Sequence, residues 1–199
     1  MIHAVFFDAG GVLVSIADFE DDYAAEALKV NRREFDKIAA KYSDACESAK
    51  ISDNEFLKKF CRAFNLDSKF VKSVWLKEYW KILKLNKAVY RIAFSLKRRG
   101  YRIGVLSNTK KMYTNLNKKK NVYFGFSPVV LSYKVKLVKP GKKIYAAACR
   151  LAKVKPSEAL FIDDRIANVK GAQKFGMRAI HYKNPSQLKI ELRKLNIKF

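Results

Sequence analysis

Residues 161–169 read Phe-Ile-Asp-Asp-Arg-Ile-Ala-Asn-Val. The apolar residues that precede the acidic pair Asp163-Asp164 are typical of a fully buried strand. Adjacent carboxylates at such a place repel each other and lose hydration, and a bound divalent cation would compensate for both costs. Hard oxygen ligands favour Mg²⁺. The alternative is that one of the two carboxylates caps the following helix. The stretch therefore predicts a strand that ends in either a metal site or a helix cap.

A second acidic residue, Asp8, leaves an apolar strand predicted over 2–7. It stands in Phe-Phe-Asp-Ala-Gly-Gly-Val-Leu, residues 6–13, where Gly10 and Gly11 break the strand. A lone aspartate at a strand end is more often a turn or cap residue than a reactive group. Asp8 gains significance only from the residues that would meet it in space.

Two further segments offer groups for an anion. Ser107-Asn108-Thr109 follows a strand predicted over 102–106, and its hydroxyl, amide and main-chain N–H groups suit phosphate oxygens as well as an ordinary N-cap. Lys139-Pro140 places a cation where the proline would fix the start of a helix. Each signal is weak alone, but four such segments at predicted strand or helix ends favour a shared site.

Strands and helices alternate along most of the chain, which predicts an α/β fold with a parallel sheet. Polar residues at the carboxyl ends of parallel strands meet in one crevice, so we expect Asp8, Ser107 and the Asp163-Asp164 pair to converge. The predicted strands are 2–7, 102–106, 129–132, 159–162 and 178–181, with helices over 89–96, 142–153 and 167–175. Gly100 and Gly176 are expected to end two of these helices.

Residues 16–85 differ from the rest because they carry helical periodicity and no strand signal. Ser52 and Asp67 have the sequence context of N-cap residues. We therefore predict a core formed by 1–15 and 86–199, with residues 16–85 inserted as a helical cap.

The charge is unevenly distributed: 42 Lys and Arg against 18 Asp and Glu give a formal net charge of +24. No Asp or Glu occurs between Tyr79 and Ser157, a stretch with 21 basic residues. Such a field could steer phosphorylated substrates, hold nucleic acid non-specifically, or be no more than a solvated surface. The 31 Lys and 11 Arg form no arginine-rich cluster, which weakens the nucleic-acid hypothesis.

Size and cysteine content indicate a protein that folds without cross-links. A chain of 199 residues, 49% hydrophobic, can bury one sizeable core with an insertion. The three cysteines, Cys46, Cys61 and Cys149, are far apart and suggest neither a disulfide framework nor a zinc site. The apolar N-terminus has no basic leader and is too short to span a bilayer, so we expect a cytoplasmic location.

At the four polar segments the sequence resembles the haloacid dehalogenase-like hydrolases, in the branch of small phosphatases with an all-helical cap. The resemblance is densest over 139–182, in Lys-Pro-x4-Tyr, Phe-Ile-Asp-Asp-x3-Asn-Val-x-Gly-Ala and Phe-Gly-Met-Arg-Ala-Ile. It implies a three-layer, Rossmann-like parallel sheet and an Mg²⁺-dependent phosphoric monoester hydrolase.

The resemblance also implies a role for each matching position. Asp8 would attack phosphorus to form an aspartyl-phosphate that water then hydrolyses. Lys139 would balance the charge on Asp8 and the phosphoryl group. The remaining implied roles are phosphoryl binding by Ser107 and Asn108, and Mg²⁺ binding by Asp8, the Gly10 carbonyl, Asp164 and Asp163, with Asp163 and Asn168 in supporting positions.

The sequence departs from the family pattern at two places. Most family phosphatases have an acid/base aspartate where this chain has Gly10, and losing such a group typically costs on the order of 10²- to 10⁴-fold in rate. A glycine there also occurs in a branch that resembles sugar-phosphate phosphatases. Relatives usually have Gly and Arg in place of Lys136 and Val138. Because of the first departure, the sequence does not identify the group that protonates the leaving oxygen. Because of the second, it does not identify the substrate.

Three functions are consistent with these residues. The first is a phosphatase for a small phosphorylated metabolite, with Tyr23, Lys50 and residues 110–120 as neighbours of the substrate. The second is a dehalogenase-type hydrolase, against which the paired acids argue because such enzymes need no metal. The third is a weak or inactive family member that binds phosphorylated or nucleic-acid ligands through the basic region 79–157. Oligomeric state is left open.

Overall fold

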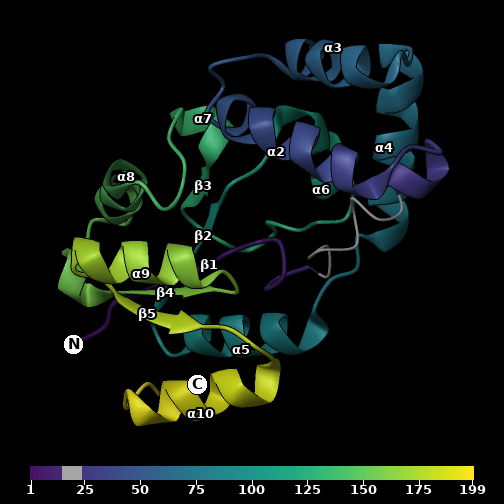
Figure 1. Cartoon of the computed structure of the whole chain (residues 1–199). Helices are drawn as coiled ribbons and strands as arrows, with labels where there is room; N and C mark the ends of the chain where they lie inside the picture. Colours follow the sequence, from purple (N-terminus) through teal and green to yellow (C-terminus); the bar gives the residue numbers. More distant parts are fainter. Residues whose placement is uncertain (15–23) are drawn as a thin grey trace.

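The computed structural model describes residues 1–14 and 24–199, and it has a five-stranded, all-parallel sheet at its centre (Figure 1). The strand order is β3-β2-β1-β4-β5, so β1 lies in the middle. The strands are β1 (Ala4–Phe7), β2 (Arg102–Ser107), β3 (Val129–Leu131), β4 (Ala159–Asp163) and β5 (Arg178–His181). All five strand predictions are confirmed to within two residues, as is the parallel α/β architecture.

The sheet is buried on both faces because its strands are apolar at successive positions. In β1, Val5 and Phe7 belong to one hydrophobic cluster, while Ala4 and Phe6 belong to a second on the opposite face. This alternation follows from the two-residue period of a strand. Helices cover both faces and complete three layers.

One face is covered by α5 (Lys87–Arg98) and α10 (Pro185–Lys194), and the other by α8 (Lys142–Ala152) and α9 (Ile166–Phe175) (Figure 1). Gly100 and Gly176 follow α5 and α9 with φ of +89° and +102°, which confirms their predicted roles at helix ends. The helix predicted over 142–153 is confirmed as α8. Gly141 precedes α8, so Pro140 lies outside it.

Residues 32–82 form three helices, α2 (Arg32–Glu47), α3 (Asp53–Phe64) and α4 (Ser68–Ile82), which Figure 1 shows apart from the helices that flank the sheet. The predicted N-caps are confirmed: Ser52 Oγ accepts from the Glu55 N–H at 3.1 Å, and Asp67 Oδ1 from the Phe70 N–H at 2.8 Å. We call α2, α3 and α4 the helical cap.

The helical cap has a hydrophobic cluster of its own, centred on aromatic rings. The Phe60 ring lies 4.9 Å from Phe35 and 5.1 Å from Trp75, centroid to centroid, and all three side chains are fully buried. Tyr113 and Val122, from outside 16–85, join the same cluster. The cap thus packs against a segment that the sequence assigned to the core.

That segment contains α6 (Thr114–Lys119), preceded by a short 3₁₀ turn (Lys111–Tyr113), and a second 3₁₀ turn (Pro156–Glu158) precedes β4. A further short helix, α7 (Ser132–Val135), follows β3.

None of the helices in the described ranges is long and apolar enough to cross a bilayer.

The two chain segments that join cap and core lie side by side. Val14 forms an antiparallel bridge with Leu85, and the Asn86 N–H donates to Leu13 O at 2.8 Å. The Asn86 side chain donates to Val12 O and to the Tyr182 hydroxyl, and it also caps α5. Asn86 therefore fixes the end of the cap to the end of β5.

The cap cluster gives a stability prediction. Phe60→Ala should lower the free energy of unfolding by about 3–5 kcal/mol, because truncating a buried aromatic side chain leaves a cavity. Phe70→Ala, at a side chain that is 50% exposed on α4, should change it by less than about 0.5 kcal/mol. Denaturant titrations of both variants test this, and equal effects would contradict the assigned packing.

Candidate active site

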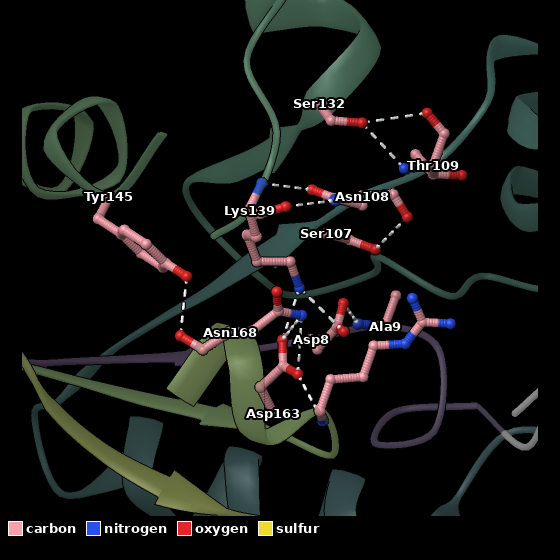
Figure 2. A network of polar contacts seen from close by, with 11 residues as sticks. Asp8, Ala9, Ser107, Asn108, Thr109, Ser132, Lys139, Tyr145, Asp163 and Asn168 are labelled. Carbon is pink, nitrogen blue, oxygen red and sulfur yellow. Dashed lines mark hydrogen bonds and ion pairs between the residues drawn. The ribbon is translucent and has the colours of Figure 1, made fainter. Parts of the chain in front are cut away.

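The carboxyl edge of the sheet brings together the predicted polar segments. Asp8 follows β1 directly, and its N–H donates to Ile162 O of β4 at 2.9 Å. Ser107 ends β2 on one side of β1, and Asp163 ends β4 on the other. The predicted convergence is observed, and Figure 2 shows these side chains with Lys139 among them.

Lys139 forms ion pairs with two carboxylates at the centre of this group. Its Nζ lies 2.9 Å from Asp8 Oδ2 and 2.7 Å from Asp163 Oδ2 (Figure 2). The ammonium is buried, and although burial acts to lower its pKa, the two carboxylates outweigh it and raise the pKa. Lys139 is therefore a fixed positive charge in contact with Asp8.

Asp163 is fully buried and surrounded by donors. Oδ1 accepts from the Arg165 N–H at 2.8 Å and from Asn168 Nδ2 at 3.0 Å, while Oδ2 accepts from Asn168 Nδ2 at 3.1 Å and from Lys139. Tyr145 donates in turn to Asn168 O at 2.8 Å. Both carboxylate oxygens of Asp163 therefore already accept hydrogen bonds, Oδ1 from Arg165 and Asn168 and Oδ2 from Asn168 and Lys139.

Asp164 completes an acidic cluster with Asp8 and Asp163. One carboxylate oxygen from each lies within 4.8 Å of the others, a spacing that suits a shared cation. Burial, followed by the charge on Asp163, raises the pKa of Asp164. Its main-chain oxygen is 2.8 Å from His181 Nε2, which anchors this residue to β5.

The charge in this cluster is incompletely balanced by protein groups. Among the described residues, only Lys139 forms ion pairs with these three carboxylates, to Asp8 and Asp163, and burial raises the pKa of Asp8 to about 7 despite the opposing effect of Lys139. A divalent cation bound by oxygen ligands would favour the ionised forms. The donor set therefore fits a hard cation such as Mg²⁺.

Ser107 and Asn108, the predicted phosphoryl-binding pair, both lie at this edge. Ser107 is 2% exposed, and within residues 1–14 and 24–199 its hydroxyl makes a single, long contact of 3.3 Å to Asn108 O. The Asn108 side chain is already paired with the main chain of Lys139, donating to its O at 3.1 Å and accepting from its N–H at 2.9 Å. Asn108 thus positions Lys139, and its amide side chain is committed to that contact.

The sequence assigns no role to three further residues that contribute to the site. Ser132, fully buried after β3, accepts from the Thr109 N–H at 2.9 Å and donates to Thr109 O at 3.2 Å, which fixes the loop after Ser107. Tyr145 matched a family motif without an assigned role. The sequence predicts His181 as an ordinary strand residue, and its role in the site follows from its hydrogen bond to the main-chain oxygen of Asp164.

The glycines after Asp8 have different environments. Gly10 is half-buried in the turn and forms a bridge with Val14. Gly11 has φ of +71°, and a Cβ built on it would lie 2.1 Å from Asp164 Oδ2. Gly11 therefore leaves the space that the Asp164 carboxylate fills.

The suggested neighbours of the substrate are only partly located. Tyr23 lies outside the described residues, and Lys50 is exposed in the turn that follows α2. Lys110 is buried between core and cap, with Nζ 3.7 Å from Glu47 Oε1 and 5.1 Å from the centre of the Phe56 ring. Lys110 is thus a contact between the loop after β2 and the helical cap.

Comparison with known proteins identifies the class. The family model for haloacid dehalogenase-like hydrolases matches residues 2–176. The chain therefore belongs to this hydrolase family, and the resemblance to the family as a whole is confirmed.

Among curated proteins, the chain is similar to a D-ribitol-5-phosphate phosphatase from Bacteroides thetaiotaomicron, 28% identical over 96% of this chain and 97% of that protein. Its fold is similar to a hydrolase structure of this family from Porphyromonas gingivalis, with TM-score 0.79 at 24% identity and full coverage of both chains. It is also similar to a B. thetaiotaomicron family enzyme solved with magnesium and inorganic phosphate, with TM-score 0.69 at 24% identity over 92% of this chain and 95% of that one.

The space beside Asp164 gives a prediction for Gly11→Ala. Gly100→Ala is the matched control, because Gly100 also has positive φ, +89°, but a Cβ there meets nothing within 4 Å. The control should lose about 1–2 kcal/mol of stability from backbone strain alone. Gly11→Ala should lose more, since it also displaces a carboxylate. Thermal and denaturant unfolding compare the two, and equal losses would contradict the Gly11–Asp164 contact.

Proposed function

We propose that this protein is an Mg²⁺-dependent phosphatase that hydrolyses a small phosphorylated metabolite through an aspartyl-phosphate on Asp8. The observation that carries the proposal is the ion pair between buried Lys139 and Asp8, next to a cluster of three carboxylates. Family membership supports a hydrolase, and the curated relative is a phosphatase.

Asp8, Asp164 and the main-chain carbonyl of Gly10 are the proposed Mg²⁺ ligands. Asp163 belongs to the acidic cluster, but its two oxygens hold Lys139 and Asn168, so we assign it mainly to positioning. When bound, Mg²⁺ would supply positive charge beside the phosphoryl oxygens and keep Asp8 ionised.

The proposed reaction has two displacements at phosphorus. A carboxylate oxygen of Asp8 attacks phosphorus, the bond to the leaving oxygen breaks, and that oxygen takes a proton from water. A second water then attacks phosphorus, which releases inorganic phosphate, a proton and the Asp8 carboxylate. Lys139, in contact with Asp8, offsets the negative charge on the equatorial oxygens as the phosphoryl group is transferred.

The remaining polar groups position these reactants. Ser107 offers a buried hydroxyl at the end of β2, the strand next to β1. Asn108 holds the main chain of Lys139, and Ser132 holds the loop at Thr109. The phosphoryl group would thus meet donors that are already oriented, which is how electrostatic preorganisation lowers a barrier.

Gly10 has no side chain to protonate the leaving oxygen. The rate should therefore depend strongly on the acidity of the leaving group, and p-nitrophenyl phosphate should react faster than an alkyl phosphate. Sugar and polyol phosphates are the first natural class to test, because the curated relative acts on a phosphorylated polyol according to its name.

The two other functions suggested by the sequence have less support. A dehalogenase-type reaction needs no cation, and the ion pairs of Lys139 would then have to balance three converging carboxylates. An inactive binding protein has no need for a buried Lys139 in contact with Asp8. The variant Asp8→Asn distinguishes both alternatives from the proposed phosphatase.

Asp8→Asn should abolish metal-dependent phosphate release, with a loss on the order of 10³-fold or more, because the amide is a poor nucleophile. Asp36→Asn, at a half-exposed carboxylate of α2, is the control and should keep full activity. Phosphate release from p-nitrophenyl phosphate and a panel of sugar phosphates is measured with Mg²⁺ and with chelator. Turnover that survives either Asp8→Asn or the chelator would refute the proposal.

Gly10→Asp should raise the rate, by up to about 10²-fold for substrates with poor leaving groups, because it supplies a general acid. The gain for p-nitrophenyl phosphate should be smaller, since its leaving group needs no proton. Equal gains, or no gain, would show that another group donates the proton.

A further inference from the structure

The structure has a cationic pocket at the edge of the sheet opposite Asp8. Its volume is about 450 Å³, and Lys97, Arg102 and Lys153 line it with Tyr101, Ile103 and Leu151. Arg102 begins β2 and Ser107 ends it, so the pocket and the candidate active site are separated by the length of this strand, about 17 Å. The pocket is therefore distinct from the Asp8 site.

The charge of this pocket is entirely positive. All of its lining residues lie in the stretch between Tyr79 and Ser157, and none of them is an Asp or Glu. Lys97 Nζ donates to Gly125 O at 2.9 Å, and Arg102 donates to Ala152 O. These contacts orient two of the cations, but neutral carbonyl groups leave their charge unbalanced.

The pocket also offers surface for the body of a ligand. Tyr101 is partly buried, Ile103 forms part of the wall, and the Leu151 side chain is 51% exposed. Pockets of roughly 300–1,000 Å³ hold small ligands, with a few polar groups fixing their orientation. Cations beside apolar and aromatic walls suit a molecule with phosphate groups at one end and a planar ring at the other.

We propose that this pocket binds a small phosphorylated molecule of nucleotide size. Lys97, Arg102 and Lys153 hold its phosphate groups, and Tyr101 and Leu151 contact its ring. The acid-free stretch thereby has a specific role in addition to any general steering of anions. The ligand reaches this pocket without passing the helical cap or Asp8.

Calorimetric titration with adenosine 5′-diphosphate tests this on the full chain. The wild type should bind one equivalent of adenosine 5′-diphosphate. It should bind this nucleotide more tightly than it binds pyrophosphate or adenosine alone. Lys97→Gln/Lys153→Asn should weaken binding by at least about tenfold, as expected when two phosphate contacts are lost. Asparagine is chosen because residue 153 has φ of +52°.

Two controls locate the binding. Lys37→Gln/Lys58→Gln removes the same charge from exposed positions of the helical cap and should leave affinity within about twofold at moderate salt. Asp8→Asn should leave affinity unchanged. An equal loss in the charge control, or any loss in Asp8→Asn, would overturn the assignment to this pocket.

A second pair of variants guards against misfolding. Leu151→Glu places a carboxylate at an exposed position of the pocket and should abolish binding, while Ile190→Glu, at a side chain equally exposed on α10, should not. Unchanged binding in Leu151→Glu, equal binding of pyrophosphate, or tighter binding of single-stranded RNA through the same lysines would overturn the proposal.

Discussion

The ion pairs of Lys139 with Asp8 and Asp163 are the interaction on which the rest of the site depends. Removing charged groups from water is costly, and the cost is offset only when partners and hydrogen bonds are well placed. Here Asn108 holds the main chain of Lys139, while Asn168 and the Arg165 N–H hold Asp163. Strands β1 and β4 carry the two carboxylates, and their direct pairing fixes the separation of the acids. The hydrophobic sheet thus holds Asp8 and Asp163 within reach of Lys139. The ion pairs in turn fix the positions of the loops at the carboxyl edge of the sheet.

The fold places the acidic cluster and the cationic pocket at opposite ends of the strands. Asp163 and Asp164 lie with Asp8 at the carboxyl ends of β1 and β4, whereas the pocket lies at the amino end of β2. Ser107 and Arg102 terminate one strand at its two ends, so β2 connects the candidate active site to the proposed nucleotide pocket. The helical cap contacts the core through Lys110 and the Asn86 connection. Hence a ligand in the cationic pocket and a substrate at Asp8 would occupy separate surfaces.

Hydrophobic periodicity and the residues that begin or end helices predict most of the fold. Strands and helix ends depend on residues that are neighbours in sequence, so the sequence predicts them directly. Examples are the helix-ending glycines Gly100 and Gly176 and the N-caps Ser52 and Asp67. The candidate site was predicted as a set of strand ends, because parallel topology brings such ends together. Its internal pairing was not: Asn108 faces Lys139 across 31 positions, and Asn86 meets Tyr182 across 96. Ser132 and His181 act through main-chain contacts that depend on three-dimensional packing, so their residue types carried no signal.

The central claim is that Asp8, held by Lys139, is the group that attacks phosphorus. The most direct test is to quench the enzyme during turnover of p-nitrophenyl phosphate with Mg²⁺, reduce it with borohydride, and map the products by mass spectrometry. Borohydride converts an aspartyl-phosphate to homoserine, so homoserine is expected at position 8 in the wild type, and none without substrate. An unmodified position 8 during rapid turnover, or a reduced residue elsewhere, would contradict it.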